Sequence, residues 1–136
     1  MAVFPARHIS VGIARPAQEV YDFLSDPAHF PQWAAGLGHS FEHVEGMTWR
    51  AETPMGRMRV LFSEPNRHGV LDHAVIPEDG PAMHNPMRVV ANGDGAEVIF
   101  TLFQRPGMSG DEMAADAGMV ARDLAALKIL LEGGRA

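Results

Sequence analysis

The 136-residue sequence contains no cysteine, only one lysine and no long apolar run. The absence of cysteine excludes disulfide bonds, thiolate nucleophiles and thiolate metal sites. No stretch approaches the roughly 18 apolar residues that a membrane helix requires, and the start lacks the basic and apolar regions of a signal peptide. We therefore expect a cytoplasmic protein with no stable membrane insertion.

Basic residues are also scarce, because 11 lysines and arginines face 17 aspartates and glutamates, for a net charge of −6. Phosphate backbones are bound by clustered basic side chains, and the nearest approach to a cluster is Arg57 with Arg59. Nucleic-acid binding is therefore not expected. The apolar fraction of 46% and the charged fraction of 21% are typical of a globular protein, which predicts a single domain over residues 1–136.

The first quarter of the chain predicts one strand followed by two short helices. Apolar and polar residues alternate between residues 4 and 14, as in a half-buried strand. Pro16 is well placed to begin a short helix, because proline fits the first helical turn. Asp26 and Pro27 repeat this signal and predict a second brief helix that ends near Trp33.

The middle of the chain, residues 39–104, alternates short apolar runs with turn sequences. About six such runs are separated by loops too short for parallel crossovers, so they predict antiparallel hairpins. With the first strand, they predict an antiparallel sheet of about six or seven strands. The turns lie at residues 45–46, 54–56, 65–69, 77–80 and 92–95.

A long amphipathic helix is predicted from Ser109 onward. Ser109 and Glu112 form a capping box, in which each side chain satisfies a backbone amide near the other residue. Gly133 and Gly134 predict its end. Apolar residues recur at spacings of three and four and form one stripe, consisting of Met113, Ala117, Val120, Leu124, Leu127 and Leu131.

This order of elements, α+β with one long C-terminal helix, is the layout of the helix-grip fold. The segments HISV at 8–11 and PAQEVYDFLSDP at 16–27, with the later segments 85–90, 93–98 and 105–109, resemble the START/Bet v 1-like (SRPBCC) superfamily. The resemblance is strongest to small bacterial polyketide cyclase/dehydrase-like members. It implies a curved sheet around the helix and a cavity that binds a hydrophobic small molecule, such as a lipid, polyketide or aromatic compound.

The predicted cavity lining follows from the apolar side of the strands and the helix stripe. The same pattern is typical of an ordinary core, so both interpretations stay open for each residue. The candidate lining residues are Trp33, Trp49, Met58, Val60, Phe62, His73, Val75, His84, Phe100, Met113, Ala117 and Val120.

His73 is the best candidate for catalysis. Alternation with Leu71 and Val75 turns His73 toward the core and Asp72 to the opposite face. In an apolar pocket a neutral imidazole could donate a proton or a hydrogen bond to a ligand carbonyl. The alternative is a core histidine that is hydrogen-bonded to a neighbouring strand or to a tyrosine.

The sequence predicts no metal or cofactor site and no further catalytic motif. His39 and His43 are four residues apart on a strand, too far apart to share a metal ion, so no metal is expected. No Ser-His-Asp order, phosphate loop or dinucleotide motif occurs, so no cofactor is expected. Arg88 follows a bulge at Pro86, and we expect it to pair with a surface acid such as Glu52 or Glu97.

The sequence therefore predicts a protein that binds a hydrophobic small molecule, with no complete set of catalytic residues. A polyketide cyclase or aromatase without a metal or nucleotide cofactor is one alternative. A protein-interaction module or homodimer is another, because the last strand carries apolar residues on both faces, with Ile99 and Phe103 opposite Val98, Phe100 and Leu102.

Overall fold

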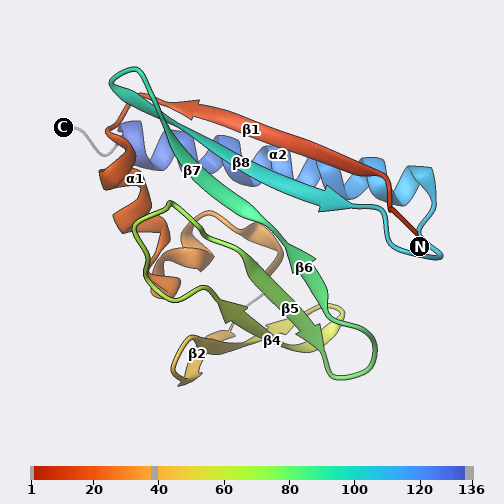
Figure 1. Ribbon diagram of the computed structural model, residues 1–136. Coiled ribbons are helices and arrows are strands. Elements are labelled where there is room, and N and C mark those ends of the chain that lie inside the picture. The colour runs from red at the N-terminus through yellow and green to blue at the C-terminus, as the bar shows by residue number, and fades with distance from the viewer. Residues whose placement is uncertain (1, 38–39, 134–136) are drawn as a thin grey trace.

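The structure is a computed structural model that describes residues 2–37 and 40–133. It contains eight strands, two α-helices and two 3₁₀ helices (Figure 1). In chain order these are β1 (Ala6–Ile13), α1 (Ala17–Leu24), η1 (Pro27–Gln32), η2 (Ala35–Leu37), β2 (Ser40–Glu45), β3 (Thr48–Thr53), β4 (Gly56–Phe62), β5 (His73–Pro77), β6 (Met83–Asn85), β7 (Met87–Asn92), β8 (Gly95–Phe103) and α2 (Gly110–Gly133).

The strands form two antiparallel sheets, where the sequence predicted one sheet of six or seven strands. One has the order β1-β8-β7 and the other β2-β3-β4-β5-β6. The sheets separate at Pro86, the predicted bulge: β6 pairs with β5 before it, and β7 pairs with β8 after it. Proline has no amide hydrogen to continue a ladder, and its carbonyl instead accepts from the amide of Thr101 at 2.9 Å. One extended segment thus belongs to both sheets.

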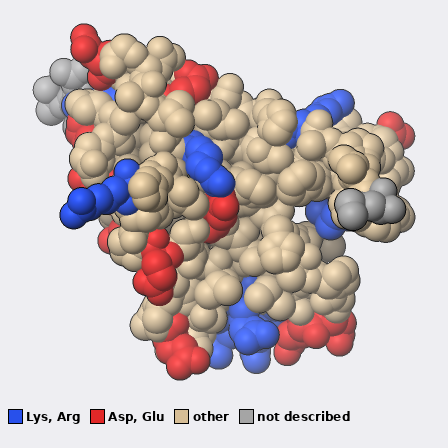
Figure 2. All heavy atoms as spheres, viewed as in Figure 1, with Lys and Arg blue, Asp and Glu red and all other residues tan. Residues whose placement is uncertain are grey.

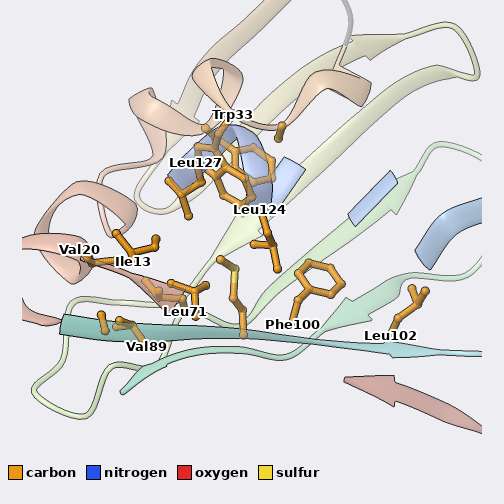
Figure 3. Packing of buried hydrophobic residues seen from close by; sticks show 14 of the residues in the cluster. Ile13, Val20, Trp33, Leu71, Val89, Phe100, Leu102, Leu124 and Leu127 are labelled. Carbon is orange, nitrogen blue, oxygen red and sulfur yellow. The ribbon is translucent and has the colours of Figure 1, made fainter. Parts of the chain in front are cut away.

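The long helix packs across the three-stranded sheet, as the sequence predicted. Figure 1 shows α2 running along β1 and β8, and contacts to both strands are present. The strand β8 buries every second residue, including Val98, Phe100 and Leu102. Leu124 and Leu127 of α2 are almost completely buried and belong with Trp33 and Phe100 to one apolar cluster (Figure 3). The α+β architecture is therefore confirmed.

The predicted helix signals are present in the structure. Ser109 Oγ accepts from the Glu112 amide and Glu112 Oε1 accepts from the Ser109 amide, both at 3.0 Å, which confirms the capping box. Asp26 Oδ1 accepts from the amide of Ala28 at 3.0 Å. The helix that follows is 3₁₀ rather than α, because it is short and contains an internal proline at Pro31.

Candidate ligand-binding cavity

A cavity of about 240 Å³ lies between the five-stranded sheet and α2. The helix packs on β1 and β8, whereas β5 and β6 precede Pro86 and belong to the other sheet, so a gap remains on the side of Val75. In Figure 2 the surface is notched between the part that carries the start of α2 and the part that carries β4 to β6. The apolar residues that line the cavity include Phe30, Trp33, Val75, Phe100, Leu102 and Val120.

His73 is the buried polar residue of this cavity, with 7% of its surface exposed. Three phenylalanine rings surround the imidazole: the centroid of Phe30 lies at 5.5 Å, that of Phe100 at 5.9 Å and that of Phe62 at 6.0 Å. Burial in these surroundings lowers the pKa of His73, because the charged form would lose its hydration. The imidazole is therefore neutral at pH 7.

The hydrogen bond of His73 determines what the ring can offer to a ligand. Nδ1 lies 3.2 Å from the carbonyl oxygen of Leu71 and must donate its hydrogen, since a carbonyl only accepts. In a neutral ring Nε2 is then an acceptor. The arrangement fits acceptance from a ligand better than the predicted donation to a ligand carbonyl.

Asp72 lies on the opposite face of the strand from His73, as the alternation predicted. Its carboxylate Oδ1 is ion-paired with Arg88 and also accepts from the amide of Met87 at 2.8 Å. Arg88 therefore pairs with a surface acid, as predicted, but the acid is Asp72 and not Glu52 or Glu97. Glu52 pairs instead with Arg57, at 2.9 Å, because the β3–β4 register places the two residues opposite each other.

Half-exposed polar residues line the cavity where it meets solvent. Arg105 Nη2 lies 3.9 Å from Asp116 Oδ2, and both side chains are more than one-third exposed. Asp123, about two helical turns after Asp116, accepts from the amide of Ala35 at 3.3 Å. Partial burial raises the pKa of Asp123, and the hydrogen bond from Ala35 opposes this shift. The lining thus contains two carboxylates and one guanidinium, and the guanidinium is paired with Asp116.

The structure brings together only part of the predicted lining. Trp33, His73, Val75, Phe100 and Val120 line the cavity. The remaining candidates, Trp49, Met58, Val60, Phe62, His84, Met113 and Ala117, lie elsewhere.

The short helices explain most of this difference. Phe30 of η1 lies against Phe41 and Phe62, with centroid distances of 5.9 and 5.1 Å, so η1 fills the space over β2 to β4. Trp49 stacks on Phe41, with 4.8 Å between their centroids. Val60 is completely buried, and the cavity is confined to the end near β5, β6 and β8.

The other displaced candidates have equally local explanations. Met113 and Ala117 are buried in the apolar cluster under α2 and do not line the cavity. His84 is exposed on β6, because its neighbours Met83 and Asn85 take the inward side of this short strand.

Several lining residues were missed by sequence reasoning, notably Phe30, Arg105, Asp116 and Asp123. A usable signal existed for the two aspartates, since a spacing of seven places them on one helical face beside Val120. No comparable signal existed for Phe30, because the 3₁₀ helix that carries it is too short to show an apolar period.

The described residues show neither a membrane span nor a metal site. Within residues 2–37 and 40–133, no helix is long and apolar enough to cross a membrane, and no three His, Asp or Glu side chains gather as a metal site would require. His43 Nε2 instead bonds to the carbonyl of Gly46 at 2.8 Å. His39, its predicted neighbour, lies outside the described residues.

Solved structures with a similar fold share little sequence identity with this chain. DynU16, a protein in the dynemicin biosynthetic locus, aligns with a TM-score of 0.71 at 17% identity, over 95% of this chain and 48% of DynU16. The chain thus spans about half the length of DynU16. CalU16 from Micromonospora echinospora aligns with a TM-score of 0.65 at 16% identity, over 96% of this chain and 76% of CalU16. Ara h 8.0201 aligns with a TM-score of 0.68 at 11% identity, over 96% and 99% of the two chains.

Sequence comparison identifies the family. A search of curated proteins found no match. The family model for activator of Hsp90 ATPase homolog 1-like proteins matches residues 14–132, nearly the whole chain. Together with the structural neighbours, this match confirms the resemblance to the START/Bet v 1-like superfamily and the helix-grip fold. The chain belongs to the activator of Hsp90 ATPase homolog 1-like protein family.

Proposed function

We propose that this protein binds a hydrophobic small molecule in the cavity between the five-stranded sheet and α2. The observation that carries the proposal is an apolar cavity, lined by Phe30, Trp33 and Phe100, that the folded chain leaves unfilled. Ligand sites in proteins are mostly apolar and contain a few oriented polar groups. His73 at the buried side and Arg105 at the entrance fit that description.

The cavity size limits the ligand. Its volume of about 240 Å³ exceeds the roughly 150 Å³ of an apolar cavity known to bind benzene. It is slightly below the roughly 300–1,000 Å³ of sites for larger ligands. A compound with about two fused rings therefore fits best, and a long lipid chain would have to extend into solvent.

Family membership supports the proposal at a coarser level. Members of this superfamily bind hydrophobic ligands or act as polyketide cyclases. Cyclase chemistry here would depend on His73, whose only hydrogen-bond partner among the described residues is a backbone carbonyl. No carboxylate orients the ring, so binding is better supported than catalysis.

Binding can be tested with 1-aminonaphthalene, a neutral two-ring dye whose emission increases in apolar surroundings. We expect the wild-type protein to enhance its emission, and native mass spectrometry to show a one-to-one complex. Val120→Phe fills the cavity and should abolish the enhancement. Ile129→Phe is the matched control, because Ile129 lies on the same helix with 72% of its surface exposed. No enhancement by the wild type, or equal enhancement by both variants, would overturn the proposal.

The cyclase alternative requires a separate test. His73→Gln should abolish turnover of a poly-keto substrate while circular dichroism shows an intact fold. Unchanged turnover by this variant would contradict a role for His73 in catalysis.

A further inference from the structure

The ring nitrogen Nε2 of His73 is a hydrogen-bond acceptor with no partner among the described residues. Nδ1 already donates to Leu71, so the lone pair of the neutral ring is on Nε2. The side chain is more than nine-tenths buried, yet no fully buried side-chain nitrogen or oxygen of the described residues lacks a partner. Nε2 is therefore not sealed inside the packed core, and His73 is part of the cavity wall.

An acceptor in apolar surroundings selects for a donor on the ligand. Phe30, Phe62 and Phe100 surround the imidazole, and none of them can donate a conventional hydrogen bond. A bound ligand excludes the water that could otherwise donate to Nε2. A ligand without a donor therefore leaves Nε2 unpaired, which costs the desolvation free energy of that acceptor. A ligand with a correctly placed hydroxyl group avoids this cost.

The charges at the entrance restrict the ligand further. Arg105, Asp116 and Asp123 all line the cavity, and Arg105 is already paired with Asp116. A carboxylate ligand would have to compete with Asp116 for the guanidinium and would be repelled by Asp123. The entrance therefore disfavours an anion.

We propose that the ligand is a neutral phenol or enol of about two rings, whose hydroxyl group donates to His73 Nε2 while its rings pack against Phe30, Trp33 and Phe100. This inference rests on the proposed function, since it assigns the ligand class and a binding residue to the same cavity. His73 is accordingly a specificity-determining residue, which recognises the hydroxyl group.

The test is isothermal titration calorimetry at pH 7.5 with 2-naphthol, 2-fluoronaphthalene and 2-naphthoate. Fluorine is close to hydroxyl in size but cannot donate a hydrogen bond. We expect 2-naphthol to bind about five- to tenfold more tightly than 2-fluoronaphthalene, the range of one net hydrogen bond. We expect 2-naphthoate to bind more weakly than both.

The variant His73→Phe should remove the preference for 2-naphthol and keep the affinity for 2-fluoronaphthalene. His73→Gln provides a carbonyl acceptor and should retain part of the preference. Because the comparison of ligands on the wild type decides the matter alone, a variant that does not fold leaves the test intact. Equal affinity of the wild type for 2-naphthol and 2-fluoronaphthalene would overturn this inference alone, whereas failure of both to bind would overturn the proposed function with it.

Discussion

His73 donates from Nδ1 to the carbonyl oxygen of Leu71, two residues earlier on the chain, at 3.2 Å. This local hydrogen bond to the backbone holds the imidazole in one tautomer without a charged partner. Asp72 lies between the two residues but points away and pairs with Arg88. The strand thus separates an exposed ion pair on one face from a neutral, buried ring on the other.

Burial of His73 predicts a pH dependence of stability. Because the folded pKa lies below the usual value near 6.5, the unfolded chain binds a proton at higher pH than the folded chain does. Stability is therefore complete above about pH 6.5 and falls as the pH decreases below it, by at most about 1.4 kcal/mol per pH unit for this group. Urea unfolding of wild type and His73→Phe between pH 7.5 and 5.5 measures this, and identical slopes would contradict it.

Leu127 should be among the most sensitive positions of the core. It has no exposed surface, and Leu127→Ala should lower the free energy of unfolding by about 2–5 kcal/mol, as for other buried leucines. Ile129→Ala, two residues later on an exposed face, should change it by less than about 0.5 kcal/mol. Thermal or urea unfolding compares the two variants, and similar losses would contradict the packing of α2 described here.

Two turn glycines provide a further matched pair. Gly69 and Gly93 both have positive φ, +69° and +58°. A Cβ at Gly69 would clash with the carbonyl oxygen of Val89, whereas a Cβ at Gly93 would meet open space. Gly93→Ala should therefore lower the free energy of unfolding by about 1–2 kcal/mol, because alanine disfavours the left-handed conformation. Gly69→Ala should lower it distinctly more. Urea unfolding of both variants provides the comparison, and equal losses would show that the contact at Val89 is unimportant.

The capping box at Ser109 should stabilise the start of α2. Ser109→Ala removes the oxygen that accepts from the Glu112 amide and should cost about 1 kcal/mol. Ser109→Asp is the matched control, because its carboxylate can accept the same bond and favours the helix N-terminus. The loss should appear in urea unfolding of the alanine variant only, and no difference between the variants would contradict the capping role.

The regular elements could be predicted because their signals are local. The alternation around Val11, the cap at Asp26 and the box at Ser109 each depend on residues close in sequence, and all are present in the structure. The side of β5 that carries His73 also followed from alternation alone. The division into two sheets did not, since it depends on which partner each half of the segment around Pro86 finds in space.

The cavity was harder to predict than the fold because its position depends on tertiary packing. Strand alternation correctly grouped Val60 with Val75, which are paired neighbours in the sheet. Only the placement of Phe30 over β2 to β4 determines that the space beside Val75 remains open. A 3₁₀ helix of six residues such as η1 is too short for a period from which its contacts can be inferred.

The measurement that tests the central claim most directly is an NMR titration of methyl-labelled protein with naphthalene. Ring currents shift methyl resonances close to a bound aromatic compound. We predict saturable shifts at Val75, Leu102 and Val120, which line the cavity, and none at Val44 and Ile129, which are exposed. The absence of shifts at the cavity methyls, or shifts confined to the exposed ones, would contradict ligand binding in this cavity.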